Sequence, residues 1–360
     1  MQAGLTSSKV KYYLRPLSPI SYEDGHLLFK KKRAVLIQDT FFNKMEVITR
    51  RGLKIKKQIY NFPEFFKVLD KNQKICEIFN NLNYKSKILK RLVFKNKKIS
   101  IFGILNVTPD SFSDGGTNLN LSAAVFNAQK MVNDGASFID VGGESTRPGA
   151  KPVTANEEIS RVIPVVQRLN FMKIDLSLDT RNSSTMEFGI ASGVKIINDV
   201  SGLTNDSKSL DVVKKYSTPV VVMHMPGTPQ TMMKKNKYND VILDVYDFLR
   251  ERIEFLTQSG LKRENIIVDP GIGFGKDYIQ NIKLIKNLSV FHSLGVPLML
   301  GVSRKRFIES ISSNSKPQHR QGGTTAATLF ALTQGIKIHR VHDVQQLNQA
   351  LIVFERLFNR

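Results

Sequence analysis

The chain has 360 residues, of which 41% are hydrophobic and 23% charged, so it can bury a large core and is not a disordered polymer. It contains no run of about eighteen apolar residues and no apolar leader, and we therefore expect no membrane span and no secretory signal. The single cysteine, Cys76, excludes an internal disulfide, which fits the reducing cytoplasm.

The net charge of +22 is concentrated in the first quarter of the chain, where residues 1–98 hold 23 Lys and Arg against 7 Asp and Glu. A basic segment can bind nucleic acid. This one shows no zinc-finger spacing and no RNA-binding aromatic motif, so we favour a solvated lysine-rich surface and expect no nucleic-acid partner. Residues 34–38 and 45–49 are predicted strands, and residues 62–69 and 74–82 predicted helices, which indicates a small appended domain.

From residue 99 onward, short apolar runs alternate with amphipathic stretches. The apolar runs predict eight strands, at residues 100–105, 138–142, 174–179, 195–199, 219–224, 265–269, 297–301 and 336–342. The amphipathic stretches predict helices at residues 122–134, 155–169, 183–192, 208–216, 240–259, 279–294, 323–334 and 344–358.

Apolar strands between helices indicate a parallel sheet that is covered on both faces. Eight strand–helix units in about 260 residues fit a (β/α)8 TIM barrel. The predicted organisation is therefore a basic N-terminal extension at residues 1–98 and an α/β barrel at residues 99–360. A doubly wound open sheet is the alternative, because periodicity does not distinguish the two.

In such a barrel the functional residues lie at the C-terminal ends of the strands and in the loops that follow them. Polar side chains occupy these positions here: Asn106, Thr146, Asp179, Asn198, His224, Asp269, Lys305, Arg340 and His342. The pattern predicts one site in the mouth of the barrel.

Asp179, Asn198 and Asp269 end three different predicted strands. A carboxylate accepts paired hydrogen bonds from a planar amino-amidine group, as in a pterin or guanine, and an asparagine supplies both a donor and an acceptor. Each residue alone would be read as a helix cap or a structural polar group. Three that converge predict a pocket for a flat heterocycle.

Arg340 and His342 are two residues apart on a strand and share one side, so they predict a clamp for a diphosphate, with a surface ion pair as the alternative. Lys305 is either an anion or ring-carbonyl partner or a solvated lysine. The loop at residues 106–116 offers oxygen ligands that suit Mg²⁺ beside a phosphate, or ordinary turn chemistry. The glycine-rich segment at residues 269–276 matches neither a Walker loop nor a dinucleotide fingerprint, and its glycines favour close approach of a flat ligand.

Seven segments, in this order, resemble the dihydropteroate synthase family. They are NVTPDSFSDGG (106–116), GGESTRPGA (142–150), INDVSGL (197–203), VMHMPGTPQTM (222–232), DPGIGFGK (269–276), GVSRKRFI (301–308) and RVHDV (340–344). The resemblance covers about residues 99–360. It implies a Mg²⁺-dependent TIM-barrel transferase of folate biosynthesis that is usually a homodimer and is the target of sulfonamides. Such enzymes join 6-hydroxymethyl-7,8-dihydropterin diphosphate to p-aminobenzoate, which yields 7,8-dihydropteroate and pyrophosphate.

The resemblance also implies roles for single residues. Asn106, helped by Asp114, would bind Mg²⁺. The pterin diphosphate would be bound by Thr146, Asp179, Asn198, Asp269, Phe274, Lys305, Arg340 and His342. The p-aminobenzoate would be bound by Phe112, Thr146, Arg147, Pro148 and Lys305. The catalytic residues would be Asp179, Lys305, Arg340 and His342, which stabilise a departing diphosphate and a pterin-methyl cation.

Two features depart from the family pattern. Arg306 stands where some relatives have a small serine, and residues 1–98 match no segment of the synthase. Some relatives are fused to a pterin pyrophosphokinase, so a remnant of that enzyme is one interpretation of the extension. The competing functions are methyl transfer from a folate to a corrinoid protein, which involves no diphosphate, nucleic-acid binding by the basic segment, and an inactive homologue.

Overall fold

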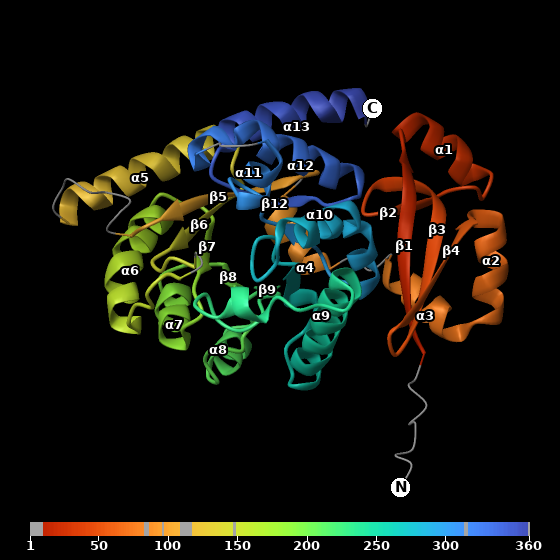
Figure 1. The fold of residues 1–360 in the computed structure, drawn as a ribbon. Coiled ribbons are helices and arrows are strands. Elements are labelled where there is room, and N and C mark those ends of the chain that lie inside the picture. The colour runs from red at the N-terminus through yellow and green to blue at the C-terminus, as the bar shows by residue number, and fades with distance from the viewer. Residues whose placement is uncertain are drawn as a thin grey trace, which may run out of the picture.

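The computed structural model describes residues 10–82, 86–95, 97–108, 117–146, 149–312 and 316–358. They form an eight-stranded parallel sheet wrapped by helices, and a smaller antiparallel sheet that precedes it (Figure 1). The prediction of a (β/α)8 barrel is confirmed.

The strands of the barrel follow the order β10-β9-β8-β7-β6-β5-β12-β11, and a parallel bridge between Val268 and Leu298 joins the two ends of this row. A doubly wound sheet would leave those ends apart, so the bridge rejects that alternative. All eight strands lie on the predicted apolar runs: β5 (Ser100–Asn106), β6 (Phe138–Gly142), β7 (Leu176–Asp179), β8 (Ile196–Asp199), β9 (Val220–Met223), β10 (Ile266–Asp269), β11 (Met299–Leu300) and β12 (Ile338–Val341).

Helices cover the outside of this barrel (Figure 1). Their bounds are α5 (Thr117–Asn133), α6 (Ala155–Phe171), α7 (Ser183–Ala191), α8 (Ser209–Lys215), η3 (Met232–Lys235), α9 (Val241–Gln258), η4 (Arg263–Asn265), α10 (Tyr278–Lys286), η5 (Leu288–Leu294), α11 (Arg306–Ser312), η6 (Pro317–His319), α12 (Gln321–Thr333) and α13 (Val344–Phe358). Within the described ranges, none of the helices has the length and apolarity that crossing a membrane requires.

Two parts of the helical prediction were wrong. The helix predicted over residues 279–294 is interrupted at Asn287, so that α10 is followed by the 3-10 helix η5. Every residue of η5 is buried, because η5 lies between the barrel and the antiparallel sheet. The short helix α11, between β11 and α12, was not predicted.

The bottom of the barrel is filled by an apolar layer. Its members point inward from seven strands: Phe102, Phe138, Ile196, Val221, Ile267, Met299 and Ile338. Leu89 and Val93 pack against this layer from α4 (Lys87–Leu89) and the π-helix η1 (Lys90–Phe94), which lie on the chain just before the first barrel strand. The N-terminal end of the barrel is therefore closed by side chains of the described residues, which leaves the opposite end for a ligand.

The N-terminal sheet is built around β3, which pairs antiparallel with β1, β2 and β4. The predicted strands at residues 34–38 and 45–49 correspond to β2 and part of β3, and the two predicted helices correspond to α2 and α3. The sequence did not predict β1, β4 or α1. The bounds are β1 (Lys11–Ile20), α1 (Tyr22–Lys30), β2 (Val35–Ile37), β3 (Thr40–Arg51), β4 (Lys54–Asn61), α2 (Phe62–Lys71) and α3 (Gln73–Leu82).

β1 and α3 pack against η5 of the barrel, and β1 also contacts α9. The hydroxyl of Tyr13 on β1 donates to both carboxylate oxygens of Asp247 on α9, at 3.1 Å each. Lys11 and Arg250 contact the same carboxylate at 2.8 Å. The ring of Tyr13 meets the ring of Tyr246 edge-on, with 5.0 Å between centroids. The antiparallel sheet is thus fixed to the barrel by buried aromatic and ionic contacts.

Candidate active site in the mouth of the barrel

A polar layer lies directly above the apolar layer, because alternate residues of a strand point to the same side. Asp140, Asn198, Asp269 and Arg340 each stand two residues beyond a member of the apolar layer, so their side chains point into the barrel. Asp179, which ends β7, is buried and bonded to this group. The predicted convergence of strand-end residues into one mouth therefore has a simple structural origin.

Arg340 is the centre of a buried network. Its Nε donates to Oδ2 of Asp140 at 2.5 Å, and its Nη2 donates to Oδ2 of Asp179 at 2.6 Å. The same oxygen of Asp140 accepts a hydrogen bond from Nδ2 of Asn198 at 3.2 Å. The sequence left a surface ion pair as the alternative interpretation of Arg340. Arg340 does form ion pairs, but they lie inside the mouth.

Burial sets the protonation of this network. It raises the pKa of Asp179 to about 7, because Arg340 offsets only part of the desolvation and Asp140 adds like-charge repulsion. Burial acts to lower the pKa of Arg340, but the two carboxylates outweigh it and raise that pKa above its usual value. The guanidinium is therefore charged at any physiological pH, whereas Asp179 titrates near neutrality.

Asp269 and Lys305 form the second part of the mouth. Asp269, at the end of β10, accepts a hydrogen bond from the backbone of Gly271 at 2.6 Å. Lys305 follows β11; its ammonium donates to the carbonyl of Ile272 and lies 4.6 Å from the centre of the Phe274 ring. Burial raises the pKa of Asp269 and lowers that of Lys305 to about 8, while each charge opposes the shift of the other. Asp269 also feels the charge of Arg340, so both belong to one electrostatic site.

The glycine-rich loop after β10 is held by a buried lysine. Nζ of Lys276 lies 2.9 Å from Nδ1 of His224, the carbonyl of Gly271 and the carbonyl of Phe274. Gly271 has φ of +68°, and a Cβ there would stand 2.0 Å from the carbonyl oxygen of His224. Gly271 therefore allows the loop to approach the backbone after β9. From the sequence, we had expected the glycines of this segment to allow a flat ligand to approach.

The SRK and RVHD segments contact each other. The hydroxyl of Ser303 lies 2.9 Å from Nδ1 of His342, and Nε of Arg304 donates to Asp343 at 2.9 Å. Arg304 has φ of +58°, an unfavourable backbone for a side chain of this size. These contacts fix the position from which Lys305 enters the mouth.

The loop after β6 is anchored by a buried ion pair. Arg181 donates to both oxygens of Glu144, at 2.8 Å each, and thereby ties this loop to the one after β7. Thr146, two residues beyond Glu144, is half-buried. Of the other predicted site residues, Phe112, Asp114, Arg147 and Pro148 lie outside the described residues.

Asn106 ends β5 beside the network. A Cβ placed on Gly142 of the next strand would lie 3.5 Å from Cβ of Asp179 and 3.7 Å from Oδ1 of Asn106. Among the described residues, no group of three or more His, Cys, Asp or Glu side chains could hold a metal ion. Asn106 therefore offers one neutral oxygen beside the buried carboxylates of Asp140 and Asp179.

Two buried residues of the site were not predicted to belong to it. Asp140 stands alone in an apolar strand, and only its spacing of two from Phe138 would have indicated an inward direction. Lys276 was treated as the last letter of a glycine-rich motif. An isolated charge inside an apolar run is the signal that could have identified Asp140, because such a charge must be paired.

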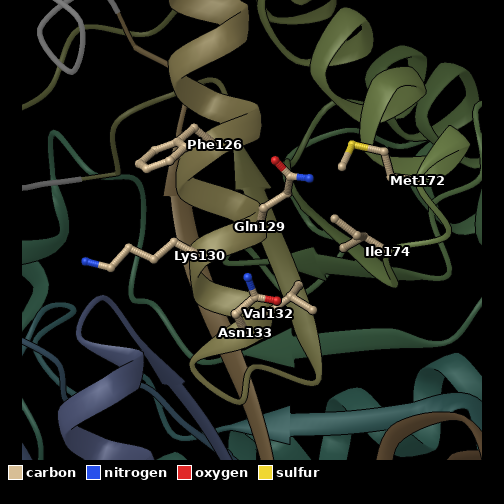
Figure 2. Close-up of a pocket in the computed structure, with 7 residues that line it drawn as sticks. All are labelled: Phe126, Gln129, Lys130, Val132, Asn133, Met172 and Ile174. Carbon is tan, nitrogen blue, oxygen red and sulfur yellow. The ribbon is translucent and has the colours of Figure 1, made fainter.

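A surface hollow of about 600 Å³ lies elsewhere on the molecule (Figure 2). It is lined by residues of α5 and by Met172 and Ile174, which precede β7. Residues that precede a barrel strand lie at the end opposite the polar mouth. This hollow therefore takes no part in the site.

Comparison with known proteins identifies the family. The family described as pterin binding enzyme matches residues 102–342. Dihydropteroate synthase of Bacillus subtilis (strain 168) is 40% identical over 270 residues, which are 75% of this chain and 92% of that protein. The Escherichia coli (strain K12) dihydropteroate synthase is 43% identical over 256 residues, 71% of this chain and 90% of that protein. A solved structure of Xanthomonas albilineans dihydropteroate synthase with 4-aminobenzoic acid has a TM-score of 0.68 and 42% identity, and covers 72% of this chain and 93% of its own.

The barrel and its polar mouth are thus those of a pterin-binding enzyme. Within this class, the chain belongs to the dihydropteroate synthase family. The activity expected from the seven segments, dihydropteroate synthesis in the folate pathway, is confirmed by this relationship. The family match begins at residue 102, so the antiparallel sheet lies outside it.

Proposed function

We propose that the polar mouth binds 6-hydroxymethyl-7,8-dihydropterin diphosphate and directs its condensation with p-aminobenzoate. The observation that carries this proposal is the contact between Arg340 and Asp179, with 2.6 Å between Nη2 and Oδ2. This contact supports the proposal because it joins a permanent cation, which we assign to the diphosphate, to a carboxylate, which we assign to the pterin methylene carbon. A related structure from Xanthomonas albilineans, solved with 7,8-dihydropteroate, supports this assignment of ligand.

The pterin ring is bound by the acidic side of the mouth. Asp269 accepts hydrogen bonds from the amino-amidine edge, Asn198 pairs with another edge of the ring, and Lys305 donates to the ring carbonyl. Phe274, whose ring lies under the ammonium of Lys305, supports the pocket from below. A buried carboxylate such as Asp269 is costly without a partner, so a ligand with two adjacent N–H groups relieves that cost.

The diphosphate is held by Arg340 and His342. Arg340 directs Nε and one N–H of Nη2 to carboxylates, and we assign its other N–H donors, chiefly those of Nη1, to phosphate oxygens. Nδ1 of His342 lies 2.9 Å from the hydroxyl of Ser303, which orients the imidazole ring, and we assign this ring to the leaving group. Both side chains arise from the same end of β12, and they therefore act on one anion.

The reaction breaks the C–O bond between the pterin methylene and the diphosphate and forms a C–N bond to the arylamine. The electron pair of the C–O bond leaves with the diphosphate, and Arg340 and His342 stabilise the growing negative charge. Ionised Asp179 stabilises the delocalised pterin-methyl cation. The neutral arylamine is nucleophilic, and the proton that it loses passes to solvent or to the departing pyrophosphate.

The acceptor is proposed to bind beside the loops after β5 and β6. Thr146 and Lys305 are the described members of this site, and Phe112, Arg147 and Pro148 complete it in the prediction. The ion pair of Glu144 with Arg181 supports the proposal, because it holds the root of the loop that carries Thr146 at the rim of the mouth.

Mg²⁺ fits this site as a partner of the diphosphate. Mg²⁺ prefers oxygen ligands and is commonly held by one or two protein oxygens together with substrate phosphates. The described residues supply one such oxygen, on Asn106, and Asp114 is the second predicted ligand. When bound, the ion would neutralise charge on the leaving diphosphate.

The decisive experiment is an assay with the full chain, the pterin diphosphate, p-aminobenzoate and Mg²⁺. We expect stoichiometric dihydropteroate and pyrophosphate, and loss of both when Mg²⁺ is chelated. Asp269→Asn tests the pocket, and Glu187→Gln, on the outer helix α7, is the matched control that should retain full activity. Methyl transfer to a corrinoid protein without pyrophosphate release would refute the proposal.

We further propose a cytoplasmic homodimer. Large apolar side chains are exposed on two neighbouring helices, with Phe330 on α12 and Ile352, Val353 and Leu357 on α13. Because α12 and α13 pack together, these exposed side chains support a protein–protein contact on this side of the barrel. Sedimentation equilibrium should give twice the chain mass of 40.7 kDa, and a monomer at micromolar concentration would contradict the proposal.

A further inference from the structure

Asp140 is a fully buried carboxylate to which the proposed mechanism gives no role. Its Oδ2 accepts two hydrogen bonds, from Nε of Arg340 at 2.5 Å and from Nδ2 of Asn198 at 3.2 Å. Its Oδ1 is equally enclosed and has no hydrogen-bond partner among the described residues. Burying a carboxylate costs free energy unless it is paired. We therefore ask which partners Asp140 binds and how it fixes their geometry.

The first partner is Asn198. An asparagine amide offers one donor group and one acceptor oxygen, and the two can exchange places by rotation. The bond to Asp140 uses one N–H of Nδ2 and fixes the orientation of the amide, so Oδ1 of Asn198 is the acceptor that the amide offers to a ligand. Asp140 thereby decides that Asn198 presents an acceptor to the ring.

The second partner is Arg340. Its guanidinium donates to Asp140 on β6 and to Asp179 on β7, and these two contacts fix the plane of the group. Nη1 and the second N–H of Nη2 are then the donors that can reach an incoming phosphate oxygen. Without Asp140, the guanidinium would keep only its hydrogen bond to Asp179, and its plane would no longer be fixed.

We infer that Asp140 is a positioning residue that holds Arg340 for the diphosphate and Asn198 for the pterin ring at once. This inference rests on the proposed function and adds to it: the two halves of the substrate are recognised by side chains that share one buried oxygen. Asp140 itself does not need to touch the substrate.

The test uses Asp140→Asn, which keeps the shape of the side chain and removes its charge. Binding of two separate probes is measured by calorimetry: inorganic pyrophosphate with Mg²⁺, and 6-hydroxymethylpterin. We expect both affinities to fall by about tenfold, the scale of one charge-assisted hydrogen bond. The KM for p-aminobenzoate should change by less than about twofold. Unchanged affinity for either probe overturns the inference.

Two further variants separate positioning from general damage. In an Arg340→Ala background, Asp140→Asn should no longer weaken pyrophosphate binding, and in an Asn198→Ala background it should no longer weaken pterin binding. A structural disturbance would weaken binding in every background, so an undiminished effect in both overturns the inference.

Ser177→Ala is the matched control. Ser177 is paired with Asp140 across β6 and β7, is fully buried and makes no side-chain hydrogen bond within the described residues. It should retain both affinities. If Asp140→Asn does not fold by circular dichroism, Asp140→Glu, which keeps the charge but displaces it, should weaken both probes. Failure of the wild-type chain to make dihydropteroate would instead overturn the proposed function.

Discussion

Asp179 and Arg340 contact each other across the mouth, at 2.6 Å between Oδ2 and Nη2, although β6 and β5 separate their strands in the sheet. The contact exists because the sheet closes and both side chains point inward. It joins a group that is always charged to one that titrates near neutrality, and this difference makes the site sensitive to pH.

We predict that catalysis rises as Asp179 loses its proton. Burial raises the pKa of Asp179 to about 7 against the attraction of Arg340, and Asp140, Glu158 and Asp199 add repulsion. Only the ionised form stabilises a pterin cation. The value of kcat/KM for the pterin diphosphate should therefore increase through about pH 7. A profile that is flat between pH 5.5 and 8 would contradict this role.

The proton on Asp179 should also affect the free energy of unfolding, which we expect to fall with pH where catalysis rises. An unfolded aspartate has a pKa of about 3.9, so between pH 4 and 7 the unfolded chain gives up a proton that folded Asp179 keeps. The free energy of unfolding should thus fall as the pH rises through this window. Because one pKa unit is worth about 1.4 kcal/mol, the loss should reach a few kcal/mol. Denaturation experiments on Asp179→Asn should show a smaller decrease in the free energy of unfolding between pH 4 and 7 than the wild type. An equal decrease in both proteins would contradict the prediction.

Asp269→Ala should abolish measurable binding of a pterin analogue. The substitution removes the carboxylate that faces the amino-amidine edge and leaves Lys305 without its compensating charge. Fluorescence titration with 6-hydroxymethylpterin measures this directly, and a thermal melt serves as the folding control. Retention of wild-type affinity would refute the assignment of the ring pocket.

Arg340→Ala should weaken pyrophosphate binding more than pterin binding. The guanidinium is the permanent cation of the mouth, and its loss also leaves Asp140 and Asp179 unpaired. We expect a loss of at least about tenfold for pyrophosphate, typical of a buried charged hydrogen bond. Calorimetry with each probe gives the comparison, and an equal loss for both would argue against a separate diphosphate clamp.

Activity should fall above about pH 8 as Lys305 loses its proton. Burial lowers the pKa of Lys305 to about 8, with Asp269 opposing the shift, and only the ammonium donates a hydrogen bond to the ring carbonyl. Lys305→Arg keeps its charge at all these values of pH. Its kcat/KM, although lower, should show no alkaline decline, whereas a decline identical to that of the wild type would assign the effect elsewhere.

Tyr13→Phe should weaken the junction of the sheet and the barrel without changing catalysis. It removes the hydroxyl that donates to Asp247 but keeps the ring against Tyr246. The loss of one hydrogen bond should cost about 1 kcal/mol in the free energy of unfolding. Guanidinium denaturation measures the cost. A change in kcat/KM beyond about twofold would show that the sheet acts on the site.

The extension shows where prediction from the sequence fails. β1 contains Pro16 and Pro19, which argue against a strand, yet among the described strands β1 pairs with β3 alone, and an edge strand tolerates proline. β4 is rich in exposed lysine and lacks an apolar period. η5 was predicted as the continuation of an amphipathic helix over residues 279–294. It is instead a fully buried 3-10 helix, in which Ser289 donates to the carbonyl of Pro16 at 2.8 Å, and no local pattern specifies that contact.

The barrel strands, their order along the chain and the polar residues at their ends follow from the sequence alone, because strand period and turn chemistry are local properties. The tertiary structure alone decides which of those residues meet. Asp140 and Arg340 are 200 positions apart, and their bond depends on closure of the sheet and on the inward direction of both side chains. The docking of the basic sheet on α9 and η5 is decided in the same way, because no local pattern specifies a distant partner.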